Sequence, residues 1–122
     1  MLPQVVNIAA ALSSFSEAWS PRVVGDVNAC QIKVVKLEGA FHWHHHDVED
    51  EAFLVVDGRL RMQFRDGDLS LAPGELVVVP RGVEHRPVAE PSCSVLLFEP
   101  ASTLNTGNVV NERTVRDLQR IG

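Results

Sequence analysis

The chain has 122 residues, of which 45% are hydrophobic and 22% are charged, a composition typical of one ordinary globular domain. Its formal net charge is −5 at pH 7, and its basic residues form no large cluster. Nucleic acids and anionic membranes both select basic surfaces. We therefore expect neither nucleic acid nor a membrane among its partners.

The cysteines and the N-terminal residues indicate the cellular compartment in which the protein is expected. Cys30 and Cys93 are too few and too far apart in the sequence to predict a disulfide framework. Residues 1–15 have no Lys or Arg ahead of their apolar part, so they do not resemble a signal peptide. No apolar run has the length of a transmembrane helix. These features favour a cytoplasmic protein with reduced thiols.

The N-terminal part, residues 1–28, is expected to form a separate arm. Apolar side chains recur near helical spacing in residues 7–18, which predicts a short helix that ends before Pro21. Residues 22–28 are expected to form a further strand.

In residues 29–100, short apolar runs alternate with Gly, Pro and Asp turn signals, a pattern that predicts an all-β sandwich or barrel. Asp57–Gly58 is expected to form a hairpin turn between strands at residues 52–56 and 59–65. A strand at residues 75–79 should be buried. The other strands are expected at residues 31–37, 41–46, 69–71, 84–88 and 92–98.

The C-terminal part, residues 101–122, is more polar. Residues 112–120 form a weak helix candidate. We expect this tail to pack either on the barrel or on a partner subunit, and the sequence leaves both possibilities open.

Three consecutive histidines are the most informative feature of the sequence. On an extended strand successive side chains alternate between faces, so His44 and His46 should point one way and His45 the other. Glu51 follows five residues later, and a lone histidine occurs at His85. Imidazole nitrogen and carboxylate oxygen suit iron, manganese, nickel, copper or zinc. The sequence therefore predicts a metal-binding protein.

Two motifs in this part of the chain resemble the two signature motifs of the cupin superfamily. The first is His44-His45-His46, four residues, Glu51, six residues, Gly58; the second is Gly74, five residues, Pro80-Arg81-Gly82, two residues, His85. The resemblance covers about residues 39–89. It implies a small single-domain jelly-roll barrel (a double-stranded β-helix) with short helical or irregular segments at both ends. It also implies that His44, His46, Glu51 and His85 bind one divalent transition metal.

A second alignment of the first motif is possible, because His42 and His44 are also separated by one residue and Glu49 follows at the same interval. The position six residues beyond Glu49 is Val56, which lies inside an expected strand, whereas Gly58 fits the first alignment. We therefore expect His42 to be a neighbour of the metal ligands that faces the same cavity.

Strand alternation also assigns the neighbouring residues. Phe41 and Trp43 share the outward parity of His45, so we expect them to pack between sheets or at a subunit contact. Arg81 is the nearest cation for an anionic substrate, although a plain surface role is favoured. The pocket walls are expected to be Phe53, Val55, Leu60, Met62 and Phe64.

The resemblance implies a metal-dependent enzyme acting on a small polar molecule, of the dioxygenase, isomerase, lyase or decarboxylase type. The chain has no Tyr, which disfavours reactions that need a tyrosine general acid. The alternatives are a non-catalytic metal- or ligand-binding or sensor barrel, and a structural or storage role. A homodimer is expected, with residues 22–28 and 31–37 as candidates for strand exchange or edge pairing.

Overall fold

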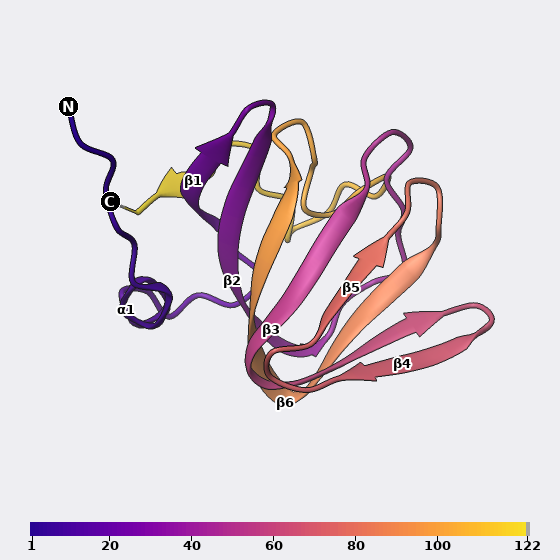
Figure 1. Ribbon diagram of the computed structural model, residues 1–122. Coiled ribbons are helices and arrows are strands. Elements are labelled where there is room, and N and C mark those ends of the chain that lie inside the picture. Colours follow the sequence, from indigo (N-terminus) through magenta and orange to yellow (C-terminus); the bar gives the residue numbers. More distant parts are fainter. Residues whose placement is uncertain (122) are drawn as a thin grey trace.

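The computed structural model describes residues 1–121 and shows one curved, mainly antiparallel sheet with a short helix at its outer side (Figure 1). The elements are α1 (Ile8–Ser13), β1 (Arg22–Val27), β2 (Cys30–Ala40), β3 (Glu51–Phe64), β4 (Gly67–Leu71), β5 (Leu76–Val79), β6 (His85–Pro100) and β7 (Gln119–Arg120). The strand order is β4-β3-β6-β2-β1-β7, and β5 pairs with β3. The predicted all-β jelly-roll fold is confirmed, although the sheet does not close.

The two longest strands, β3 and β6, pair along their length from Ala52 opposite Phe98 to Phe64 opposite His85. The expected hairpin turn at Asp57–Gly58 is wrong, because β3 continues through this point with an irregular register against β6. Gly58 has φ +80°, and a Cβ there would lie 2.6 Å from the carbonyl oxygen of Ser92. The glycine therefore permits a bend and a close approach of backbones within a strand.

Two further strand predictions differ from the structure. Residues 84–88 and 92–98 belong largely to one continuous strand, β6, rather than to two. Strand β5 is not buried, since Leu76 and Val78 are 62% and 55% exposed. Within β5, Val79 is buried in the core and the partly buried Val77 packs against it.

The main hydrophobic core lies on the inner face of the curved sheet. A second, smaller cluster packs α1 against the outer face through Ala11, Leu12 and Val34. The core consists of Val35, Leu37, Phe53, Val55, Leu60, Met62, Leu71, Val79, Ala89, Cys93, Val95 and Leu97.

Helix α1 is shorter than the predicted residues 7–18. The side chain of Asn7 accepts a hydrogen bond from the N–H of Ala10 and caps the helix. The hydroxyls of Ser13 and Ser14 donate to the carbonyls of Ala9 and Ala11 in the last turn. Such side-chain bonds compete with continuation of the helix.

The C-terminal segment, residues 101–121, packs on the sheet of its own chain. The helix expected at residues 112–120 is absent: these residues form turns and then β7, which runs parallel to β1. The side-chain amide of Asn105 donates to the carbonyl of Arg113 and accepts from the N–H of Val115. These bonds use backbone groups that a helix would pair internally. No helix in residues 1–121 is long and apolar enough to cross a membrane.

Candidate metal centre

Four side chains from three parts of the chain converge at the inner face of the sheet. His44 and His46 lie on the segment between β2 and β3, Glu51 begins β3, and His85 begins β6. All four are at least 95% buried. The structure therefore brings together the four residues that the motifs predict as ligands.

The expected strand at residues 41–46 is largely irregular. It is tied to β6 where the N–H groups of His44 and His85 donate to each other's carbonyl oxygens, at 3.0 and 2.9 Å, and where the N–H of Phe41 donates to the carbonyl of Pro87 at 2.9 Å. The alternation of side chains nevertheless holds here, because His45 points outward and contacts the carboxylate of Asp47.

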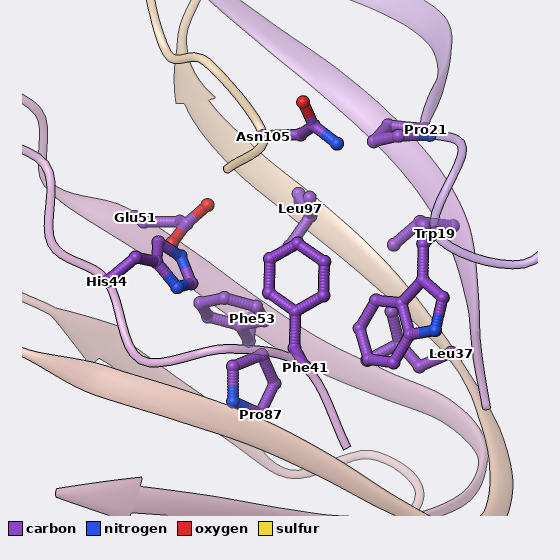
Figure 2. Close-up of a pocket in the computed structure, with 11 residues that line it drawn as sticks. Trp19, Pro21, Leu37, Phe41, His44, Glu51, Phe53, Pro87, Leu97 and Asn105 are labelled. Carbon is purple, nitrogen blue, oxygen red and sulfur yellow. The ribbon is translucent and has the colours of Figure 1, made fainter. Parts of the chain in front are cut away.

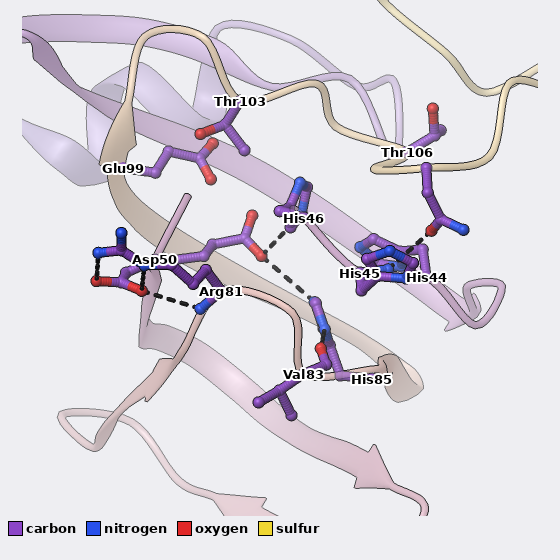
Figure 3. Close-up of polar contacts among 12 residues, drawn as sticks. His44, His45, His46, Asp50, Arg81, Val83, His85, Glu99, Thr103 and Thr106 are labelled. Carbon is purple, nitrogen blue, oxygen red and sulfur yellow. Dashed lines mark hydrogen bonds and ion pairs between the residues drawn. The ribbon is translucent and has the colours of Figure 1, made fainter. Parts of the chain in front are cut away.

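Each of the four residues offers one ligand atom, and these atoms all lie within 4.8 Å of one another. The Oε1 atom of Glu51 is 3.3 Å from Nε2 of His46 and 3.4 Å from Nε2 of His85 (Figure 3). This spacing brings the donors into one compact group around a common point.

The other ring nitrogens fix the orientation of two imidazoles. Nδ1 of His44 lies 3.1 Å from the carbonyl oxygen of His42, and Nδ1 of His85 lies 2.9 Å from that of Val83. A carbonyl can only accept, so each Nδ1 carries the proton and each Nε2 presents a lone pair to the cluster.

These lone pairs are buried without a protein donor. Nε2 of His46, Nε2 of His85 and Oε1 of Glu51 have no hydrogen-bond partner among residues 1–121. Buried acceptors that face one another are unfavourable unless a cation or proton lies between them. Three imidazoles and one carboxylate are a donor set that suits a divalent transition metal, so these residues fit such an ion.

The electrostatics keep the ligands in their metal-binding forms. Burial, reinforced by the nearby His85, lowers the pKa of His44 from 6.5 to about 3, so its ring is neutral at physiological pH. Burial opposes ionisation of Glu51, but its close polar contacts with His46, His85 and Glu99 outweigh burial and hold the Glu51 pKa well below its ordinary value.

Sequence reasoning missed a buried ion pair behind Glu51. Nζ of Lys33 lies 2.8 Å from Oε1 of Glu99, and both side chains are 2% exposed. Burial and the neighbouring charge of Glu51 raise the pKa of Glu99 well above its ordinary value. Glu99 therefore retains a proton more readily than Glu51. Strand alternation could have found both residues, because Lys33 shares the inward parity of Val35, and Glu99 that of Leu97.

The competing histidine does not face the cluster. Nε2 of His42 lies 3.3 Å from the carbonyl oxygen of Thr106, and Nδ1 lies 3.2 Å from the amide nitrogen of Asn111. The expectation that His42 shares the ligands' cavity is therefore wrong, because the C-terminal segment holds both ring nitrogens. Glu49 instead accepts a hydrogen bond from Ser102 at the surface.

Two aromatic residues with the same predicted parity have different environments. Phe41 is buried and lies beside the metal centre, so the expectation that it faces outward is wrong. Because residues 41–43 are not a regular strand, alternation does not hold there. Trp43 lies under the guanidinium of Arg65, at 3.7 Å from the ring centroid.

Arg81 has the surface role favoured by the sequence. Its guanidinium forms an ion pair with Asp50 at 3.1 Å, and both side chains are about half exposed (Figure 3). The pair lowers the pKa of Asp50 through hydrogen bonds from the Arg81 side chain and backbone. The cation is thus engaged outside the cluster.

A cavity, here called the apolar pocket, opens beside His44 and Glu51 (Figure 2). Of the residues that strand alternation predicts as pocket walls, only Phe53 lines the apolar pocket. Val55, Leu60 and Met62 belong to the core instead, and Phe64 lines a separate surface hollow. The remaining lining residues are Trp19, Pro21, Val35, Leu37, Phe41, Pro87, Leu97 and Asn105.

A curved antiparallel sheet with three histidines and one glutamate at its inner face defines the jelly-roll class with a candidate metal site. The sequence profile of the cupin domain matches residues 32–98, which contain all four residues. The chain therefore belongs to the cupin domain family, as the two motifs predict.

Similar proteins occur in several bacteria. A cupin-2 domain containing protein from Shewanella frigidimarina NCIMB 400 is 45% identical, with 79% of this chain and 94% of that chain covered and a TM-score of 0.77. Protein NMB1881 from Neisseria meningitidis is 33% identical, with 80% and 100% covered and a TM-score of 0.73. Protein YdbB of Bacillus subtilis (strain 168) is 27% identical over 86 residues, which are 70% of this chain and 76% of YdbB.

Proposed function

We propose that this protein is a metal-dependent cupin enzyme acting on a small molecule. His44, His46, Glu51 and His85 would bind one divalent transition metal, namely iron, manganese, nickel, copper or zinc. The observation that supports the metal is the set of buried lone pairs on His46, His85 and Glu51, which have no partner among residues 1–121. A bound ion of this kind supplies Lewis acidity toward an oxygen atom of the substrate.

The apolar pocket supports an enzymatic rather than a purely structural role for the metal. Structural metal sites are enclosed by their ligands, whereas catalytic sites leave access for a substrate. His44 and Glu51 both line the apolar pocket, so a small molecule there would lie directly beside two of the ligands. The reaction would be of the dioxygenase, isomerase, lyase or decarboxylase type.

Elemental analysis tests the proposal, on protein purified without a chelator or a histidine tag. We expect near-stoichiometric metal in the wild type, a strong loss in His85→Ala, and little change in His45→Ala, since His45 points outward. Iron with substrate-dependent oxygen uptake would assign a dioxygenase, and another metal without uptake would assign one of the other classes. Absence of metal, even after reconstitution, would overturn the proposal in favour of a non-catalytic ligand-binding barrel.

We also propose a homodimer, but not by pairing along β2, which lies inside the sheet between β6 and β1. Leu76, Val78 and Phe98 are exposed apolar residues. Val78 and Phe98 both pair with Ala52, so they lie in one row across the sheet. A second copy would cover this apolar row. Light scattering that shows only a 13.4 kDa species would overturn this proposal.

The cysteines support a proposed location in the cytoplasm. Cys30 and Cys93 are both free thiols, a state that reducing compartments maintain. Cell fractionation that recovers the protein outside the cytoplasm would contradict this location.

A further inference from the structure

The composition of the apolar pocket restricts the kind of molecule that it can accept. His44 and Glu51 form one end of the pocket (Figure 2). A molecule that fills it therefore has one end at the metal centre and the rest of its surface against the other walls. Those walls decide which chemical class fits.

One wall is an aromatic stack. The rings of Trp19 and Phe41 are 4.6 Å apart between centroids, with an interplanar angle of 22°. Both residues line the pocket together with Phe53. Aromatic walls favour flat rings, which pack on them by offset stacking or edge-to-face contact.

The backbone holds Trp19 in an unusual conformation to build this wall. Its φ is +59°, in the left-handed region that bulky residues rarely adopt and that is enriched at ligand-binding and active sites. Its N–H donates to the carbonyl of Lys36, and its indole N–H donates to the carbonyl of Glu38. The indole therefore has no free hydrogen-bond donor for a polar ligand.

The polar side chain at the pocket apart from His44 and Glu51 is Asn105, and its amide is already engaged with Arg113 and Val115. Arg113 does not line the pocket. Its guanidinium lies 5.1 Å from the ring centroid of Trp19 and 5.4 Å from that of Phe41, and it donates to the carbonyl of Ala40. No Lys or Arg lines this pocket. Beyond the metal centre, a sugar, carboxylate or phosphate would lose hydration along these apolar walls, where few groups could replace its contacts with water.

We propose that the substrate is a single-ring aromatic alcohol, of the phenol or catechol class. Its ring would contact Trp19 and Phe41, and its hydroxyl oxygens would face His44 and Glu51. The cavity volume is about 40 Å³, small beside typical small-molecule sites, which restricts the ligand to a single ring that would extend from the cavity toward its open mouth. This inference rests on the proposed function, since it places the reacting oxygens at the metal centre, and it replaces the polar substrate expected from the motifs.

Ligand binding to metal-loaded protein tests the inference. The probes are catechol and galacturonate, which both carry vicinal hydroxyls, but only catechol has an aromatic ring. Zinc-loaded protein under anaerobic conditions avoids oxidation of the catechol. A Trp43→Phe background leaves Trp19 as the one tryptophan, because the chain has two, so its fluorescence reports on the pocket.

We expect catechol to quench Trp19 fluorescence. Its affinity should be at least about tenfold higher than that of galacturonate. Phe41→Ala should weaken catechol binding by about tenfold. Phe98→Ala is the matched control, because Phe98 is on the outer face and 40% exposed, and it should leave the affinity unchanged. If Phe41→Ala does not fold, Phe41→Leu keeps the volume but removes the ring, and should also weaken binding.

Galacturonate binding as tightly as catechol would overturn the inference, as would catechol binding that is indifferent to Phe41. Zinc content is measured on the same samples. Protein that holds zinc but not catechol contradicts the substrate class and leaves the proposed metal site intact. Protein that holds no zinc contradicts the proposed function. In that case, phenol binding to the metal-free pocket would support the substrate class, and a lack of phenol binding would overturn it.

Discussion

Lys33 and Glu99 form a fully buried ion pair whose carboxyl group lies behind the candidate metal ligand Glu51 (Figure 3 shows Glu99 and its surroundings). Nζ of Lys33 donates to Oε1 of Glu99 at 2.8 Å, whereas Oε2 of Glu99 accepts no hydrogen bond from a protein donor within residues 1–121. The pair therefore gives the buried Glu99 a cationic neighbour in the core. It also fixes the position of the Glu99 carboxyl group beside Glu51.

Removal of the lysine should be destabilising. In Lys33→Met, Glu99 stays buried without its hydrogen-bond donor. Because the raised pKa of Glu99 lets it hold a proton, the free energy of unfolding should fall by about 1–3 kcal/mol. The double variant Lys33→Met/Glu99→Met should recover much of this loss, because an apolar pair of similar volume needs no charge compensation. Urea denaturation of the two single variants and the double variant measures the coupling.

Arg120→Met is the matched control for the lysine substitution. Arg120 also pairs with an acid, Asp26, but both side chains are more than half exposed, so its loss should hardly change the urea midpoint. Equal destabilisation by Lys33→Met and Arg120→Met would show that burial of the Lys33–Glu99 pair has no energetic importance.

The stability of the metal-free protein should fall as the pH decreases below neutrality. The pKa of His44 is about 3 in the folded protein and 6.5 ordinarily, so between these values the unfolded chain binds the additional proton. Stability is therefore fully present above pH 6.5 and declines toward pH 3. From this residue alone, the loss between about pH 7.5 and pH 5 amounts to about 2 kcal/mol.

Urea midpoints of metal-free His44→Gln, compared with wild type at the two pH values, isolate this contribution. The variant should lose this part of the pH dependence. His45→Gln should keep it, because His45 lies at the surface beside Asp47. A His44→Gln variant with the full wild-type pH dependence would assign the effect to other groups.

The candidate ligands could be predicted because their signal is local. His44 and His46 need only one short extended segment to share a face, and Glu51 and His85 follow from the motif spacing. The strands were also largely predictable from alternation and turn residues. The hairpin turn predicted at Gly58 was wrong, because the sequence cannot distinguish two uses of a glycine with positive φ. Such a glycine suits a hairpin turn, but it also suits the bend that β3 makes against Ser92.

The apolar pocket could not be predicted, because it depends on contacts between distant parts of the chain. Phe41 faces the pocket only because its segment leaves the regular strand geometry on which parity depends. Trp19 comes from the loop before β1 and reaches Phe41 through a bond to Lys36 of β2. Asn105 comes from the C-terminal segment, whose fold is set by side-chain bonds rather than by hydrophobic periodicity.

Close packing of the C-terminal segment against the metal centre gives a final prediction. Gly107 has φ +62°, and a Cβ there would lie 2.5 Å from the carbonyl oxygen of His45 and 2.7 Å from Cδ2 of His44. Gly107→Ala should therefore displace either the segment or the His44 ring and weaken metal binding. Gly39→Ala is the control, since Gly39 has a similar φ of +70° but no neighbouring atom within 4 Å of the added Cβ.

Both alanine variants share the cost of a left-handed backbone, about 1–2 kcal/mol, so the difference between them reports the steric contact alone. We expect Gly107→Ala to be less stable than Gly39→Ala by about 1–3 kcal/mol in urea denaturation. Competition with a chelator should show weaker zinc binding only for Gly107→Ala. Equal zinc affinity in the two variants would mean that the C-terminal segment does not hold His44 in place, and that the ligand ring is oriented by the His42 carbonyl alone.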